Sequence, residues 1–149
     1  SSLFSSSMGL DARQLAWLEK MLNKEDLPGF LFLHVPPVDP RGKDHAFIDP
    51  NQAQAFIELV TAPTSPVQAV FSGHIHMFNQ SQTPGVQFVT SGGGGAPLYA
   101  SADQGGYHHF ALCQPASDGF KVKPVKIKAP PRPLELVISG AEGDLIFSG

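Results

Sequence analysis

The sequence predicts an α/β domain whose β-sheet mixes parallel and antiparallel strands. Two apolar runs, at residues 30–33 and 67–71, are separated by a segment with helical periodicity. This order is typical of a strand, a crossover helix and a second, parallel strand. After residue 85, short apolar runs alternate with glycine-containing turns, which is typical of antiparallel strands. We therefore expect a parallel pair first and an antiparallel region after it.

Two helices are expected, and each is preceded by an aspartate cap. Asp11 and Gln14 form a capping-box pair, so the first helix begins at Asp11. Asp49 precedes the second helix and Pro50 occupies its first turn. The apolar residues expected to pack are Leu15, Trp17, Leu18 and Leu22 in the first helix and Ala53, Phe56, Ile57 and Val60 in the second.

The remaining strands are expected at residues 86–89, 107–112 and 120–128. In the last of these segments the lysines occupy odd-numbered positions before Pro124 and even-numbered positions after it. This change predicts an edge strand with a bulge at Pro124, protected from pairing by its lysines. A proline-rich break follows. The chain therefore divides into a domain at residues 1–128 and a terminal β-hairpin extension at residues 129–149.

Composition excludes several classes of protein. With 149 residues, of which 42% are hydrophobic, the chain can bury a core. A net charge of -3, with lysines that are few and dispersed except near residue 121, argues against nucleic acid as a bulk partner. No apolar run approaches the roughly 20 residues of a membrane span. The single cysteine, Cys113, excludes an internal disulfide and is expected in the core. Composition does not indicate a cellular location.

Three histidines follow the two predicted parallel strands. His34 ends the first apolar run, and His74 and His76 follow the second in the sequence Gly-His-Ile-His. Parallel strands joined by a crossover helix end at the same edge of a sheet, and residues i and i+2 of an extended segment share a face about 6.6 Å apart. A single histidine at a loop end is usually solvated. Three at two strand ends favour a metal site formed by His34, His74 and His76.

A polar, proline-rich loop between His34 and the second helix is expected to form a rim over the strand ends. Its candidate substrate-binding residues are Arg41 and His45, with Asp39 and Asp44 as further charged candidates. The guanidinium of Arg41 suits a phosphate group, because its N–H groups match two phosphate oxygens at once.

Four glycines at residues 92–95 predict a tight turn beside the histidine edge. No lysine and helix start follow them at the spacing of a phosphate-binding loop, so that motif is absent. His108 and His109 fall on opposite faces of their predicted strand, so at most one can face the site. We expect hydrogen-bonded, structural histidines there.

Taken together, the segments 70–76, 88–95 and 106–110 resemble the carboxyl-terminal half of a calcineurin-like metallophosphoesterase. The resemblance covers residues 1–127. It implies half of a β-sandwich flanked by helices in four αββα layers. By resemblance, two divalent ions (manganese, iron or zinc) would be bound, one by His34 and His74 and the other by His76. The implied activity is hydrolysis of a small-molecule phosphomonoester or phosphodiester.

The family's amino-terminal motifs, an Asp-X-His, a Gly-Asp followed by a further aspartate, and a Gly-Asn-His, do not occur in this sequence. In the family they supply a bridging carboxylate, an asparagine ligand and the histidine that assists the leaving group. The assisting histidine is therefore expected in a missing amino-terminal half, and the chain is expected to be inactive without it. The sheet face that this half would cover is expected to be exposed and to allow self-association.

Two other classes of function stay open. A mononuclear zinc hydrolase could use three histidines with water as the fourth ligand. Alternatively, the chain is a noncatalytic metal-binding or interaction module. Metal stoichiometry separates the three hypotheses: two ions for a dinuclear site, one for the mononuclear site, and none or a labile one for the module.

Overall fold

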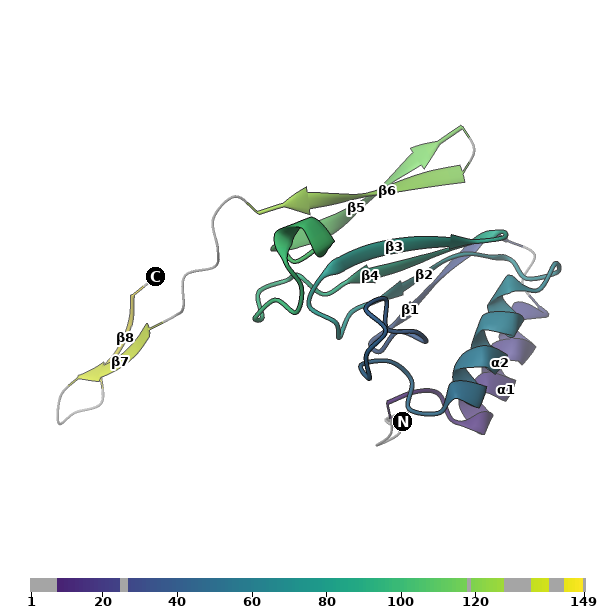
Figure 1. Cartoon of the computed structure of the whole chain (residues 1–149), viewed down its shortest axis with the longest axis horizontal. Coiled ribbons are helices and arrows are strands. Elements are labelled where there is room, and N and C mark those ends of the chain that lie inside the picture. Colours follow the sequence, from purple (N-terminus) through teal and green to yellow (C-terminus); the bar gives the residue numbers. More distant parts are fainter. Residues whose placement is uncertain (1–7, 25–26, 118, 128–134, 140–143, 149) are drawn as a thin grey trace.

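The computed structural model describes residues 8–24, 27–117, 119–127, 135–139 and 144–148. Helices α1 (Ala12–Leu22) and α2 (Pro50–Thr61) lie on one side of a four-stranded sheet, and the β5–β6 hairpin lies on the other (Figure 1). The strands are β1 (Gly29–Leu33), β2 (Val67–Ser72), β3 (Phe78–Thr83), β4 (Val86–Ser91), β5 (His109–Ala116), β6 (Gly119–Lys126), β7 (Glu135–Ser139) and β8 (Asp144–Ser148), with a 3-10 turn at Ala102–Gln104. No helix in this described part of the chain is both long and apolar enough to cross a membrane.

The four-stranded sheet has the order β1-β2-β4-β3 and mixes both strand directions, which confirms the predicted fold class. As predicted, β1 and β2 are parallel. The expectation that all later strands are antiparallel was wrong, because β4 pairs in parallel with β2. The strand that runs in the opposite direction is β3, which forms an antiparallel hairpin with β4. The sequence Phe-Asn-Gln-Ser-Gln-Thr of β3 has no apolar alternation, since most of this edge strand faces solvent.

The helix caps follow the sequence prediction. The Asp11 carboxylate accepts from the backbone N–H of Gln14 at 2.8 Å, and the Gln14 side chain accepts from the Asp11 N–H at 2.9 Å. In α2, Asp49 accepts from the N–H of Asn51 at 2.8 Å. Trp17 was expected to pack beside the apolar stripe of α1, but it is 59% exposed, because it lies on the solvent side of the helix.

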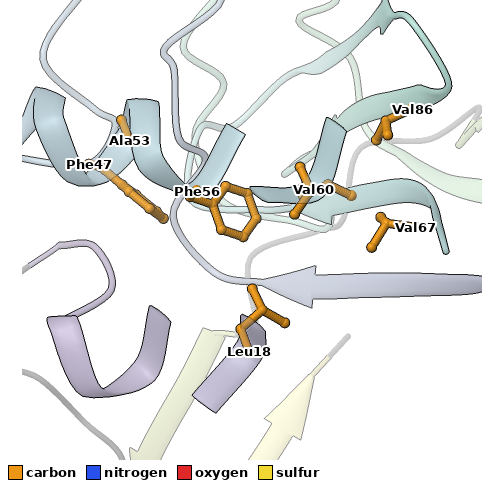
Figure 2. Close-up of a cluster of buried hydrophobic side chains, with 8 residues drawn as sticks. Leu18, Phe47, Ala53, Phe56, Val60, Val67 and Val86 are labelled. Atoms are coloured by element: carbon orange, nitrogen blue, oxygen red, sulfur yellow. The ribbon is translucent and has the colours of Figure 1, made fainter. Parts of the chain in front are cut away.

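The main core lies between the helices and one face of the sheet (Figure 2). Phe56 and Val60 of α2 are almost completely buried there, and Leu18 of α1 points toward them. The buried cluster consists of Leu18, Phe47, Ala53, Phe56, Val60, Val67, Val70 and Val86. Because the cluster includes side chains of β2 and β4, this packing holds the ends of both strands, and the loops that follow them, in place.

The other face of the sheet is aromatic and only partly covered by the hairpin. Phe30 contacts Phe120 of β6 with ring centroids 4.6 Å apart, while Phe32 stacks on Phe71 at 5.1 Å. Phe32 is 76% exposed. Cys113 of β5 is exposed as well, so its predicted place in the core was wrong. A two-stranded hairpin is too narrow to enclose its own inner side chains.

The β5–β6 pairing is regular along its whole length, and Pro124 pairs with Ala111. The predicted bulge at Pro124 was therefore wrong. In a two-stranded ladder half of the backbone N–H groups face outward, so a proline in such a position removes no ladder bond.

The β7 and β8 strands pair antiparallel, as predicted for the terminal hairpin. The proline-rich break, residue 128, Leu134 and Gly149 lie outside the described residues. The domain boundary at 128–129 therefore stays a prediction.

Candidate metal centre

His34 and His74 meet at the carboxyl edge of the parallel strands. Leu33 pairs with Ser72, so the chain leaves β1 and β2 at the same level, and the Gly73 N–H donates to the His34 carbonyl at 3.0 Å. The His74 Nδ1 and His34 Nε2 atoms are 3.3 Å apart, and the ring centroids are 5.2 Å apart. The structure thus brings these two sequence-predicted residues into direct contact.

A tight turn projects the histidines of the Gly-His-Ile-His segment outward. Ile75 is fully buried, while the backbone bonds from Ile75 to Gly73 and from Met77 to Ile75 are 2.6 and 2.7 Å long. His74 has φ 59° and is the non-glycine residue with positive φ in the described chain. This left-handed conformation is uncommon for a residue with a side chain and recurs at functional sites.

The glycine run explains how close this turn lies to β4. A Cβ added to Gly92 would overlap the carbonyl oxygen of Ile75, and the Gly92 N–H donates to Met77 at 3.0 Å. The glycine run therefore lies beside the histidine edge, as expected, and the tight turn within it stays a prediction. Only a residue without a side chain allows the backbone to approach this closely.

We expect Gly92→Ala to destabilise the protein by about 1 to 3 kcal/mol, because the new methyl group has to displace the backbone of the histidine turn. Urea unfolding of the variant measures this loss. Gly94→Ala is the matched control, since a Cβ at Gly94 meets nothing within 4 Å. Equal stability of the two variants would contradict the close approach at Gly92.

His76 has its own partners rather than joining the contact between His34 and His74. Its Nδ1 lies 2.7 Å from the carbonyl oxygen of Pro97, and its ring stacks on Tyr99 with centroids 4.2 Å apart. A carbonyl oxygen can only accept, so Nδ1 carries a hydrogen. In a neutral imidazole of this tautomer the lone pair is on Nε2, which is the atom that could bind a metal ion.

The contact between His34 and His74 fits one bound metal ion. Two imidazole nitrogens on a tetrahedral zinc ion, each about 2.0 to 2.1 Å from the metal, lie about 3.4 Å from each other. The separation of 3.3 Å agrees with this value. Within the residues that the structure describes, however, no group of three or more histidine, cysteine, aspartate or glutamate side chains is arranged to hold a metal. The described residues thus bring two imidazoles together, and the third predicted ligand, His76, does not join them.

The electrostatics of the site favour the neutral form of His74. The pKa of His74 is lowered from its ordinary value of 6.5, chiefly by burial and then by the neighbouring His34 and His45. A positive charge on His74 would be unfavourable in this partly buried place beside other rings that can carry charge. Neutral imidazole is the form required of a metal ligand.

Asp39 organises the loop that carries both predicted substrate-binding residues. It is 4% exposed and accepts hydrogen bonds from Arg41 Nε at 3.0 Å and Nη2 at 2.8 Å, and from the His45 backbone N–H at 3.3 Å. The hydrogen bonds from the Arg41 guanidinium are the main cause that lowers the pKa of Asp39 to about 2. The loop is therefore held by a buried ion pair.

We expect Asp39→Asn to cost about 2 kcal/mol of unfolding free energy at pH 7, because the lowered pKa reflects stabilisation of the ionised carboxylate. This stabilisation is complete above about pH 5 and is lost as the pH falls toward 2. The difference between wild type and variant in urea unfolding should therefore shrink at pH 3. Asp44→Asn, an exposed residue of the same loop, is the control. An unchanged difference at pH 3 would contradict the assignment.

Both predicted substrate-binding residues lie beside the histidines. The His45 ring is 6.0 Å from the His74 ring and 5.5 Å from the Tyr99 ring, centroid to centroid. The guanidinium carbon of Arg41 lies 5.3 Å from the centroid of Tyr99. The ring of Tyr99, in the segment after the glycine run, thus contacts both the proline-rich loop and the histidine turn.

His108 and His109 have structural partners, as expected. His109 is 2% exposed, and its Nδ1 donates to the Tyr107 carbonyl at 2.7 Å while its Nε2 lies 3.1 Å from the Ser91 hydroxyl. His108 Nδ1 lies 3.4 Å from the Gly93 carbonyl. Neither takes part in the contact between His34 and His74.

Sequence reasoning missed Pro97 and Tyr99. The sole signal in the sequence is their place directly after the glycine run, at the edge where the histidines were expected. Neither residue stands in a metal-ligand or catalytic motif of this sequence. Their role depends on backbone atoms and ring faces, which a residue pattern does not encode.

Comparison with known proteins supports the fold. No family model matches the sequence, and no curated protein matches it. Among solved structures, a dimetal phosphatase from Danio rerio superposes with a TM-score of 0.56 at 23% sequence identity. The chain shares this protein's fold. The superposition covers 78% of the present chain but 35% of the phosphatase, so the chain spans about a third of that protein's length.

Proposed function

We propose that this chain supplies part of a dinuclear metal site that hydrolyses phosphoesters. The observation that carries the proposal is the 3.3 Å contact between His34 and His74 at the carboxyl ends of two parallel strands. The fold shared with a dimetal phosphatase supports the same reaction class. A small-molecule phosphomonoester or phosphodiester is the substrate class.

Each side chain has a distinct role in this proposal. His34 Nε2 and His74 Nδ1 hold one divalent ion, and His76 Nε2 holds the second; manganese, iron and zinc are the candidates. When bound, the ions supply Lewis-acid activation of water and neutralise charge on the phosphate. Arg41 and His45 bind phosphate oxygens at the rim. Arg41 keeps donors for this purpose, since Asp39 uses its Nε and Nη2 atoms and Nη1 makes no hydrogen bond to the described residues.

The remaining ligands and the group that assists the leaving group come, in this proposal, from polypeptide outside these 149 residues. Two observations support this. Among the described residues, the imidazoles of His34 and His74 are the only two within hydrogen-bonding distance of each other, and the chain covers 35% of the phosphatase it resembles. The aromatic sheet face, with Phe32 76% exposed, is available to such a partner segment or to a second copy of the chain.

Turnover assays test the proposal. The natural polypeptide that contains these residues, loaded with manganese or zinc, is expected to hydrolyse an aryl phosphate or a bis-aryl phosphate, and the 149-residue chain alone is expected to be nearly inactive. Without a bridging carboxylate, two ions about 3.5 to 4 Å apart would repel each other uncompensated. Robust metal-dependent hydrolysis by the monomeric chain would instead favour a self-sufficient three-histidine zinc site.

Metal stoichiometry decides between the proposal and its alternatives. Elemental analysis of the natural polypeptide, loaded with metal and then dialysed, is expected to give two ions per site. One tightly bound ion would indicate the mononuclear zinc hydrolase. No bound ion, or one lost on dialysis, would indicate a noncatalytic module and would remove the proposed function.

A further inference from the structure

The ring of Tyr99 lies where three segments of the site meet. It stacks on the His76 imidazole with centroids 4.2 Å apart and an interplanar angle of 30°. The Arg41 guanidinium carbon lies over the same ring at 5.3 Å from its centroid, and the His45 ring meets it edge-on at 5.5 Å. One side chain therefore contacts a proposed metal ligand and both proposed substrate-binding residues.

The backbone around Tyr99 also fixes His76. The Tyr99 N–H donates to the His76 carbonyl at 3.0 Å, and the Pro97 carbonyl accepts from His76 Nδ1 at 2.7 Å. These bonds hold one edge of the imidazole, while the Tyr99 ring covers its face. Rotation of the imidazole would break the bond to Pro97 and the stacking contact together.

The aromatic ring rather than the phenol group makes these contacts. Tyr99 is 41% exposed, and its hydroxyl makes no hydrogen bond to the described residues. The cation lies over the ring, and such an arrangement is attractive because the ring face carries partial negative charge. Phenylalanine should therefore replace Tyr99 with little loss, whereas an aliphatic residue should not.

We propose that Tyr99 is a positioning residue: its ring fixes the imidazole of His76 and the guanidinium of Arg41 relative to each other. The His76 Nε2 lone pair and the free Nη1 donors of Arg41 are then held at one site before any substrate binds. The consequence for catalysis rests on the proposed function, but the positioning itself does not.

Histidine side-chain NMR of the metal-free 149-residue chain tests the positioning directly. In wild type and in Tyr99→Phe, His76 is expected as a single tautomer protonated at Nδ1. The chemical shifts of its ring protons are expected to be displaced by the ring current of the stacked aromatic side chain. In Tyr99→Leu, we expect that ring-current shift to vanish and the two tautomers to mix. If Tyr99→Leu fails to fold, Tyr99→Met takes its place with the same expectation.

Tyr107→Leu is the matched control, because the chain's other tyrosine contacts His109 and Lys126 instead. It is expected to leave the His76 signals unchanged. A His76 tautomer and ring-proton shift that stay the same in Tyr99→Leu would overturn the proposal.

Kinetics of the natural polypeptide test the consequence for catalysis. Tyr99→Leu is expected to lower kcat and raise KM by about 10-fold each, since loss of a group that orients a metal ligand typically costs 10- to 100-fold. Tyr99→Phe should stay within about twofold of wild type. Wild-type kinetics in Tyr99→Leu would overturn the catalytic part. An inactive wild type would instead refute the proposed function, while the NMR result still decides the role of Tyr99.

Discussion

Replacing His74 with alanine in the natural polypeptide is expected to reduce phosphoester turnover by at least about 100-fold, because even groups that only orient a metal ligand cost 10- to 100-fold when removed. The fold should survive, since His74 lies in a turn at the strand end and is absent from the buried core. Turnover of an aryl phosphate at saturating manganese, compared with thermal unfolding of the same samples, measures both effects.

His108→Ala is the control for this experiment. His108 is a partly buried histidine near the same edge, with the Gly93 carbonyl as its hydrogen-bond partner at 3.4 Å. It should retain activity close to that of wild type. Wild-type turnover in His74→Ala would remove His74 from the mechanism, and equal losses in both variants would point to a general effect on structure.

Phe56→Ala is expected to destabilise the protein by about 3 to 5 kcal/mol, because truncating a buried phenylalanine removes apolar burial and leaves a cavity. Phe56 is 1% exposed and lies at the centre of the cluster between α2, α1 and the sheet (Figure 2). Many small domains have only about 5 to 15 kcal/mol of stability, so this loss would remove a large share of it. Urea unfolding followed by circular dichroism measures the loss.

Gln54→Ala serves as the control on the same helix. Gln54 is exposed and its amide donates to Glu58 at 2.8 Å, one turn further along α2. Its replacement should change stability by no more than about 0.5 kcal/mol. A loss below about 1.5 kcal/mol for Phe56→Ala would contradict the assignment of this cluster as the main core.

The helices and the parallel pair were predictable because local chemistry specifies them. Asp11 and Asp49 cap helices that start where the sequence indicates, and Phe56 and Val60 fall on the buried face that the 3.6-residue period predicts. The meeting of His34 and His74 followed from topology, because parallel strands in register place their carboxyl ends side by side.

The rest depended on contacts that no local pattern encodes. Strand β3 is polar and is held by its ladder with β4, so its side chains carry no strand signal. Cys113 has apolar neighbours in sequence but lies on a hairpin too narrow to bury it. Tyr99 acts through a ring face, and its partners His76 and Arg41 lie 23 and 58 positions away in the sequence.

The most direct measurement of the central claim is anomalous X-ray diffraction at the zinc edge from crystals of the chain grown with zinc. We expect an anomalous peak between His34 and His74, about 2.0 to 2.1 Å from both His34 Nε2 and His74 Nδ1. A crystal at saturating zinc in which these two nitrogens remain hydrogen-bonded to each other, with no peak between them, would contradict the claim that they share a metal ion.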